Sequence, residues 1–236
     1  DEEAGSLQIE DEFLYPVLVS PQQTNDYLLN PIDLETRYFY CDKVKHSIGT
    51  TNALSYINEG ENQDYHLATT VVKRKLWYKG REVTMPHMCL ATTMNKMPKF
   101  IVCEQKVVLS DNFAELEIKP DYLHCKDIIT GILQSTLVSL FIELGGRKPY
   151  GGGAMKIQMY EIANIPIIKP DLIKQLEPLN RKRLEFEMEM ISEDRIKLDE
   201  IIFDALELDR EERKELVQAY KKLVNNRTKK SSQISS

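Results

Sequence analysis

The clearest hydrophobic pattern in the chain lies between residues 127 and 144, where apolar side chains recur every three or four positions. This spacing places them on one face of a helix. The apolar positions are Ile129, Ile132, Leu133, Leu137, Leu140, Phe141 and Leu144. Gly145 and Gly146 follow, and glycine is common where a helix ends. Because few polar residues interrupt the stretch, the pattern predicts one helix that is buried against a sheet.

Three further helices are predicted from similar patterns. Residues 180–206 are amphipathic, with an apolar stripe of Leu184, Met188, Ile191, Leu198, Ile202 and Ala205. Asp209 and Glu212 have the spacing of a capping box, which opens a last helix. The inward side chains of that helix are predicted to be Leu216, Tyr220 and Leu223. A short helix is predicted over residues 50–60, with Gly60 at its end.

Short segments rich in aromatic and β-branched residues predict strands. They cover residues 13–19, 37–42, 88–93, 100–104, 106–109 and 114–118. Only short segments of turn-forming residues, at 95–98 and 110–112, separate neighbouring strands. Such short connections favour an antiparallel or mixed sheet. The predicted fold class is α+β: a twisted antiparallel or mixed sheet with a buried helix, followed by a C-terminal helical extension.

Charge is distributed unevenly around a net value of −6. Residues 1–36 hold nine acidic residues and no Lys or Arg, whereas residues 37–120 hold twelve bases and nine acids. We therefore predict an acidic leader over 1–36, a central domain over 37–170 and the helical extension over 171–236. The mildly basic centre is compatible with weak phosphate contact.

The N-terminal residues and the length of the apolar runs indicate the cellular compartment of the protein. No apolar run approaches the ~20 residues of a membrane span. The start, Asp-Glu-Glu, lacks the basic region of a signal peptide. We expect a cytoplasmic protein with no membrane partner. The absence of an initiator Met suggests a fragment of something longer.

A basic, glycine-rich segment is the most informative motif. Arg147 and Lys148 lead through Tyr150 into Gly151, Gly152 and Gly153. Glycine permits positive φ and close backbone approach. An alternating strand is predicted next, with one polar face formed by Lys156, Gln158 and Tyr160. A flexible basic loop before such a strand suits a phosphate-bearing polymer, and the alternative is an ordinary hairpin loop.

A second segment interleaves cations with aromatic residues. It contains Lys73, Arg74, Lys75, Trp77, Tyr78, Lys79 and Arg81. Arg pairs with phosphate or reads guanine, and aromatic rings stack on bases. The alternative is a solvated β-edge whose lysines discourage edge pairing, and composition favours neither. For Trp77 a place in the core is the better interpretation.

Two groups of residues have side chains of the types that bind metal ions. Glu115, Glu117 and Lys119 alternate on one predicted strand face with Asp111 upstream, which resembles the outline of a metal-dependent nuclease centre. A solvated strand face is the favoured interpretation. Four cysteines (Cys41, Cys89, Cys103, Cys125) lack Cys-x-x-Cys spacing, although His46, His87 and His124 lie near some of them. Buried thiols in a reducing compartment are favoured over zinc.

The chain contains no recognisable cofactor cradle or catalytic motif. The three glycines precede a strand, whereas a dinucleotide or phosphate loop places them between a strand and a helix. Asn30-Pro31 continues as Ile32-Asp33 and so does not form an Asn-Pro-Pro-Tyr loop. We therefore predict no catalytic, cofactor-binding or metal-binding residues.

The order of these elements resembles a known family. The resemblance rests on Arg37-Tyr-Phe-Tyr40, Ala53-Leu-Ser-Tyr-Ile-Asn-Glu-Gly60, Trp77-Tyr78 after Lys73-Arg74, Gln134-Ser135-Thr136, Gly151-Gly-Gly-Ala-Met-Lys156, Ile165-Pro166 and the 197–208 tail. Together they look like the C-terminal target-recognition region of adenine-N6 DNA methyltransferases of restriction–modification systems. Gln134 stands where that family often has Asn. The methyl-donor site and the Asn-Pro-Pro-Tyr loop are missing.

The resemblance implies a target-recognition domain over 37–170 that binds double-stranded DNA. S-adenosylmethionine is then expected in an N-terminal methyltransferase domain of the same polypeptide, with no cofactor in this chain. The residues expected to contact DNA are Lys73, Arg74, Lys75, Lys79, Arg81, Lys96, Lys99, Arg147, Lys148, Tyr150, Gly151, Gly152, Gly153 and Lys156. Two alternatives stay open: the metal-dependent nuclease domain, and a protein-interaction module built on the last two helices.

Overall fold

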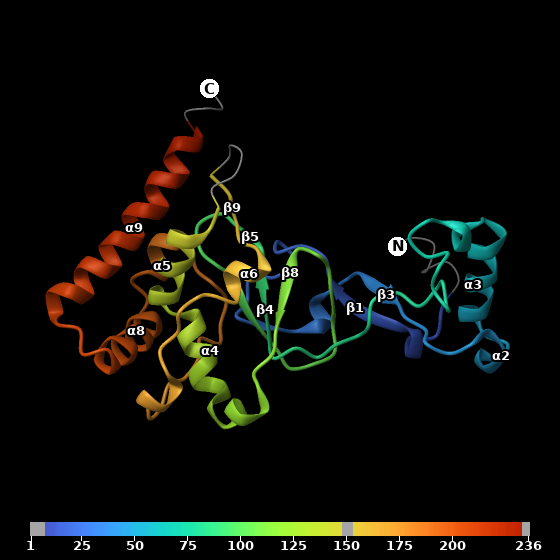
Figure 1. The fold of residues 1–236 in the computed structure, drawn as a ribbon, viewed down its shortest axis with the longest axis horizontal. Helices are drawn as coiled ribbons and strands as arrows, with labels where there is room; N and C mark the ends of the chain where they lie inside the picture. The colour runs from blue at the N-terminus through green and yellow to red at the C-terminus, as the bar shows by residue number, and fades with distance from the viewer. Residues whose placement is uncertain (1–7, 148–152, 233–236) are drawn as a thin grey trace. The chain divides into compact units, whose positions relative to one another are not determined.

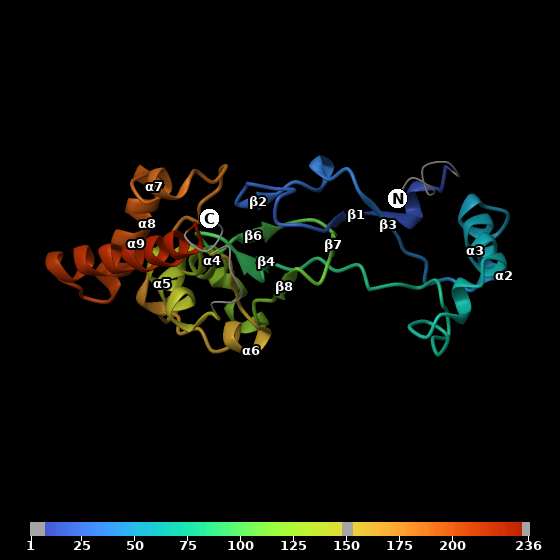
Figure 2. The same cartoon turned by 90° about the horizontal axis from the view of Figure 1, so that it is seen from above.

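The computed structural model describes residues 8–147 and 153–232, and side chains as far as residue 229. The chain forms two compact units. Unit 1 comprises Asp1–Gln23, Asn30–Met85 and Glu104–Ser110, and unit 2 comprises Thr24–Leu29, Pro86–Cys103 and Asp111–Ser236. Both contain strands and helices, so the predicted α+β class is confirmed. Figures 1 and 2 show the elements of each unit.

Unit 1 is built on a three-stranded sheet in the order β3-β1-β7. Strand β1 (Leu14–Leu18) pairs antiparallel with β3 (Arg37–Phe39) and parallel with β7 (Val108–Leu109). The 3-10 helices η1 (Asp11–Phe13), η2 (Pro31–Asp33) and η3 (Tyr65–Leu67) flank the helices α2 (Lys45–Ile48) and α3 (Asn52–Asn62). The predicted boundary at residue 36 lies between β1 and β3, which pair with each other in this sheet. The division into an acidic leader and a central domain stays a prediction.

Helix α3 fulfils the predicted helix at 50–60, with one difference at its end. The Thr51 side chain accepts a hydrogen bond from the amide of Leu54 at 3.1 Å and so caps the first turn. Gly60 does not end the helix, which continues to Asn62. Instead a Cβ at Gly60 would lie 2.4 Å from the Trp77 ring. Gly60 is therefore required for the close approach of Trp77 to the helix, and Trp77 packs against the unit 1 core as expected.

Unit 2 contains a four-stranded sheet in the order β2-β6-β4-β8. Strand β2 (Leu28–Leu29) pairs parallel with β6 (Phe100–Cys103), and β4 (Met88–Ala91) pairs antiparallel with β6 and with β8 (Phe113–Leu116). A separate two-stranded antiparallel sheet is formed by β5 (Thr93–Met94), which follows β4 in the chain, and β9 (Met155–Lys156). The mixed sheet predicted from the sequence is thus confirmed, although its strands are shorter than expected.

The predicted helix over 127–144 is two helices, and this expectation was wrong. After η4 (Pro120–Cys125), α4 (Lys126–Gln134) and α5 (Thr136–Gly145) meet at Ser135 with a bend of 58°. The Ser135 hydroxyl accepts a hydrogen bond from the amide of Val138 at 3.2 Å. The Asp199 carboxylate accepts one from the amide of Thr136 at 2.8 Å. These two caps replace the helical hydrogen bonds that are lost at the break.

Most apolar side chains of this bent pair belong to the unit 2 core or pack against it, including Ile132, Leu137 and Ile142. The predicted apolar position Leu144 is exposed instead. Within the described residues, no single helix is long and apolar enough to cross a membrane. The bent pair passes such a test by length and composition alone.

The predicted helix over 180–206 was also wrong in its first half. Helix α7 (Phe186–Glu189) is a short turn, and only α8 (Glu193–Ala205) is a longer helix. Residues before α7 run extended, and the amide of Tyr27 donates to the carbonyl of Arg181 at 3.0 Å. The first half of the expected apolar stripe is exposed: Leu184, Met188 and Ile191 are 44%, 57% and 57% exposed. The neighbouring Phe186 and Met190 are buried instead.

A buried charge network explains why these residues stay extended. Glu189 is fully buried and accepts hydrogen bonds from the Tyr27 hydroxyl at 2.7 Å and from Arg181 at 2.8 Å. Arg195, 1% exposed, lies 3.1 Å from the same carboxylate. Burial alone would raise the pKa of Glu189, but hydrogen bonds from Arg181 and the Leu184 amide lower it to about 2. A regular helix here would break this network.

Helix α9 (Arg210–Ser232) begins at the predicted capping box. The Asp209 carboxylate accepts from the amide of Glu212 at 2.9 Å, and the Glu212 carboxylate accepts from the amide of Asp209 at 2.8 Å. Both halves of the box are thus present. Tyr220 is fully buried as expected, and α9 lies alongside α5 (Figure 1).

Candidate nucleic-acid interface

Three cations of unit 2 lie on neighbouring backbone segments, and we call them the basic ladder: Lys96, Arg147 and Lys156. Lys156 of β9 is the pairing partner of Thr93 in β5 and also of Arg147, with reciprocal backbone hydrogen bonds of 3.1 Å to the latter. Lys96 follows β5 by two residues. All three side chains are exposed. The ladder therefore presents three cations from three segments of one unit.

The strand after the glycines is shorter than predicted. Met155 is buried and Lys156 exposed, as the alternation required, but β9 ends there. Gln158 begins the helix α6 (Met159–Ile162), and the amide of Gln158 donates to the Glu161 carboxylate at 2.7 Å. The prediction of one polar strand face through Tyr160 was therefore wrong, because a capped helical turn replaces the strand.

The glycine segment is only partly within the described residues. Lys148, Tyr150, Gly151 and Gly152 lie outside them, so their predicted DNA contacts stay predictions. Gly153 is described, and its φ of 68° lies in the left-handed region. Glycine suits this position because other residues adopt such a φ at a cost.

Arg147 has an acidic neighbour. Its Nε lies 3.0 Å from the Glu161 carboxylate, and it also donates to the Tyr160 hydroxyl. The hydrogen bond to Glu161, followed by that to Tyr160, raises the pKa of Arg147. An incoming phosphate would have to share this guanidinium with Glu161 or displace it.

Lys99 differs from the ladder because its ammonium group is directed to the protein. Its Nζ donates to the carbonyl of Thr24 and to the side chain of Asn25, both at 3.2 Å. Burial, followed by the charge of Arg183, lowers the pKa of Lys99. These contacts fix Lys99 within unit 2, and its predicted DNA contact stays a prediction.

The basic and aromatic segment of unit 1 forms a series of turns, so the alternative of a β-edge was wrong. Lys73, Arg74 and Lys75 are exposed there. Lys79 lies 2.6 Å from the Glu82 carboxylate, a hydrogen bond that raises the pKa of Lys79. Arg81 donates to the carbonyl of Leu109. Arg74 likewise donates to the carbonyl of Lys79 at 3.3 Å. Lys73 and Lys75 are thus the exposed cations of this segment that are most accessible to a ligand.

Trp77 and Tyr78 of the same segment serve the interior. The Trp77 indole donates to the Glu61 carboxylate at 3.2 Å, and the Tyr78 hydroxyl donates to the carbonyl of Lys43 at 2.8 Å. Tyr78 is buried. Both aromatic rings are therefore packing residues of unit 1 and not free stacking platforms.

One buried cation near the basic ladder was not predicted. Arg227 of α9 pairs with Glu143 of α5 and donates to the carbonyls of Asn95 and Gly153. The signal for it was present: Tyr220, Val224 and Arg227 recur at four and three residues, which places an arginine on the buried stripe of α9.

The metal-dependent nuclease alternative requires carboxylates that converge on one point. Strand β8 ends one residue before Glu117, so the predicted shared face does not extend to Glu117 and Lys119. Glu117 instead lies 2.8 Å from Nδ1 of His87. Among the described residues, Asp111, Glu115 and Glu117 join no group of three or more metal-ligating side chains. The geometry gives this alternative no support.

The four cysteines are buried and form no disulfide with one another, in agreement with the prediction of buried thiols. His124, Cys125 and Asp171 are the one group, in the parts of the chain described, whose ligand atoms lie within 4.8 Å of one another. A closed structural zinc site takes four protein ligands. This group supplies three, two of them exposed, and so falls short of such a site.

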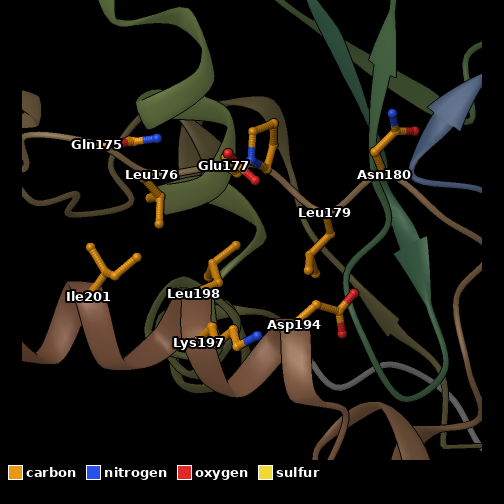
Figure 3. Close-up of a pocket in the computed structure, with 10 residues that line it drawn as sticks. Gln175, Leu176, Glu177, Leu179, Asn180, Asp194, Lys197, Leu198 and Ile201 are labelled. Atoms are coloured by element: carbon orange, nitrogen blue, oxygen red, sulfur yellow. The ribbon is translucent and has the colours of Figure 1, made fainter.

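A pocket of about 470 Å³ lies between residues 175–180 and α8. Figure 3 shows its apolar side chains, Leu176, Leu179, Leu198 and Ile201. Asp194 at its edge already pairs with Arg181 at 2.5 Å. The hollow therefore offers apolar surface but no free catalytic pair.

Comparison with known proteins gives two findings. Residues 23–203 match the family of the C-terminal domain of Type II methyltransferase M.Eco57I. The solved structure of the type IIG restriction endonuclease BpuSI is similar with a TM-score of 0.56 at 15% identity. That similarity covers 98% of this chain and 28% of BpuSI, so the chain spans less than a third of that enzyme. No curated protein matches.

Proposed function

The chain belongs to the family of C-terminal domains of type II methyltransferases that includes M.Eco57I, and from this premise we propose that it recognises double-stranded DNA. It acts as the specificity region of a restriction–modification enzyme that methylates adenine at N6. The catalytic steps belong to an N-terminal domain of the same polypeptide. That domain would bind S-adenosylmethionine and receive the adenine after it is flipped out of the duplex.

The basic ladder is the observation that carries the proposal. The chain as a whole is acidic, with a net charge of −6, so DNA must be held by a local cluster of cations. Lys156 on β9, Arg147 on the bridge to Lys156 and Lys96 in the turn after β5 supply such a cluster. Reciprocal backbone hydrogen bonds hold the Cα atoms of Arg147 and Lys156 side by side, which suits contact with neighbouring phosphates. The exposed Lys73, Arg74 and Lys75 of unit 1 provide a second, separate set.

Salt dependence of DNA binding tests the ladder directly. The variant K96A/R147A/K156A should be made in the full-length enzyme and compared with the wild type on one duplex over a salt series. Each phosphate contact contributes about 0.9 to the slope of log K against log salt. Loss of all three should therefore lower the slope by about 2–3 and weaken binding to specific and nonspecific duplexes alike.

A matched control removes one cation elsewhere in unit 2. Lys197 is exposed and lies 2.7 Å from Glu193 on α8, so K197A should keep the wild-type slope. The variant K73A/K75A tests unit 1 in the same way. A triple variant with wild-type slope and affinity would exclude the ladder as a DNA contact. Selection of bound sequences from random duplexes by the full-length enzyme then measures specificity.

A further inference from the structure

The last helix of the chain contacts the basic ladder from inside unit 2. Arg227 on α9 is 8% exposed and Glu143 on α5 is 2% exposed. The guanidinium Nε lies 2.8 Å from one carboxylate oxygen, and Nη2 lies 2.9 Å from the other. This arrangement is a two-point pair between a planar guanidinium and a carboxylate. It ties α9 to α5.

The remaining donor of Arg227 goes to the ladder backbone. Its Nη1 donates to the carbonyl of Asn95, in the turn after β5, and to the carbonyl of Gly153, just before β9. Asn95 directly precedes Lys96, and Gly153 is three residues before Lys156. One guanidinium therefore joins the turn that carries one ladder cation to the loop that leads to another.

Helix α9 holds the same turn at a second point. Met97 packs against the buried cluster that contains Tyr220 and Val224 of α9. The Tyr220 hydroxyl lies 3.5 Å from the carbonyl of Lys96. The backbone of the turn is thus fixed on both sides of Lys96, while the Lys96 side chain stays exposed.

The chemistry of the pair argues for a role in position. A buried ion pair contributes little to stability compared with a well-packed apolar pair, because both charges lose their hydration. An apolar pair between α5 and α9 would not bind two carbonyls. Arginine can do so because its donors are held in a rigid planar fork, which lysine lacks. The arrangement of Arg227 therefore fits a device that sets loop geometry.

We propose that Arg227 and Glu143 are positioning residues that hold Lys96, Arg147 and Lys156 in the spacing required for DNA binding. The inference rests on the proposed DNA-binding function of the ladder. In this view the C-terminal part of α9 supports the recognition site from inside unit 2 and does not contact DNA itself. Neither residue touches DNA, because both side chains are buried.

The test uses R227K in the full-length enzyme. Lysine keeps a positive charge opposite Glu143 but cannot bind the carboxylate and both carbonyls together. Specific binding to duplex DNA should weaken about tenfold, as expected for the loss of one or two buried hydrogen bonds. The salt slope should stay at the wild-type value, since every ladder cation remains. Hydrogen exchange at the amides of Arg147 and Lys156 should become faster.

Arg213 supplies the matched control on the same helix. It pairs with Glu200 and Asp204 and donates to the carbonyl of Leu208 at 2.9 Å, so it too has several partners. R213K should leave DNA affinity and the two amide exchange rates unchanged. Effects of equal size in R213K and R227K would overturn the inference, because they would show general loosening of α9.

The double variant E143L/R227M keeps the test decisive if R227K fails to fold. It removes both charges and fills the space with apolar side chains, and it should show the same tenfold loss with an unchanged slope. Wild-type affinity and exchange in a folded variant would overturn the inference. The DNA contact of the ladder is judged separately: it is excluded if K96A/R147A/K156A keeps the wild-type slope and affinity, whatever R227K does. The proposed function itself fails if the full-length wild-type enzyme selects no sequence from random duplexes.

Discussion

Replacing Glu189 with Gln would remove the central charge of the buried network in unit 2. The carboxylate is fully buried and has Tyr27, Arg181 and Arg195 as partners. Its pKa falls from an ordinary 4.5 to about 2, a difference that corresponds to about 3 kcal/mol. Breaking a buried pair by removal of one partner costs about 3–5 kcal/mol. E189Q should therefore lower the unfolding free energy of unit 2 by about 3 kcal/mol at pH 7.

The loss should depend on pH in a defined direction. Because folding lowers the pKa, the ionised carboxylate stabilises the folded state fully above about pH 4.5. That contribution is lost as the pH falls through about 2, the pKa in the folded state. The gap between wild type and E189Q should therefore shrink steadily between these two values.

Urea denaturation of this chain separates the two units by their spectroscopic signals. Far-ultraviolet circular dichroism reports mainly α4, α5, α8 and α9, all in unit 2. Fluorescence reports the one tryptophan, Trp77, in unit 1. The control E187Q changes an exposed carboxylate of the same short helix and should alter stability by less than about 0.5 kcal/mol. Equal stability of wild type and E189Q at pH 7 would refute the reasoning.

Two further predictions concern close packing. G60A should destabilise unit 1 by about 1–3 kcal/mol, because the new Cβ would lie 2.4 Å from the Trp77 ring. G145A should be neutral or stabilising, because no atom lies within 4 Å of its new Cβ. The urea midpoints measured by fluorescence and circular dichroism report these changes, and equal effects of the two variants would contradict the packing argument. The thiols of Cys89 and Cys103 are buried 4.0 Å apart, and their hydrogen bond, together with burial, raises the pKa of Cys89. Ellman's reagent should modify them only as fast as the chain unfolds, and rapid labelling of the native chain would contradict their burial.

Elements with local signals were predictable from the sequence. The capping box at Asp209 forms as its spacing indicated, because both partners lie within one helical turn. The short strands could be found because β-branched and aromatic residues cluster between turn residues. The helix 127–144 was misread because its break depends on Asp199, more than sixty residues later, which caps Thr136. Ser135 caps α5 locally, but the carboxylate that binds the Thr136 amide lies too far along the chain for a local pattern to indicate it.

The sequence indicates which cations belong to the candidate site but not how they are arranged in space. Lys96 and Lys156 were identified as exposed cations, but their shared ladder depends on the pairing of β5 with β9 across about sixty residues. Lys99 looks equivalent in sequence, yet its ammonium group binds Thr24 and Asn25. The helical spacing of Tyr220, Val224 and Arg227 indicates that Arg227 is buried, but its partners come from three distant segments and cannot be found from that spacing. Long-range pairing, and not residue type, decides these roles.

The interleaving of the two units constrains how such a region can be exchanged between enzymes. The chain passes from one unit to the other five times, at residues 23/24, 29/30, 85/86, 103/104 and 110/111. A chimaera joined at one point, for example after residue 36, would supply β1 from one parent and β3 from the other. Only a graft that moves residues 24–29, 86–103 and 111–236 together would transplant unit 2 intact. A single crossover within the chain would therefore divide at least one unit between the two parents.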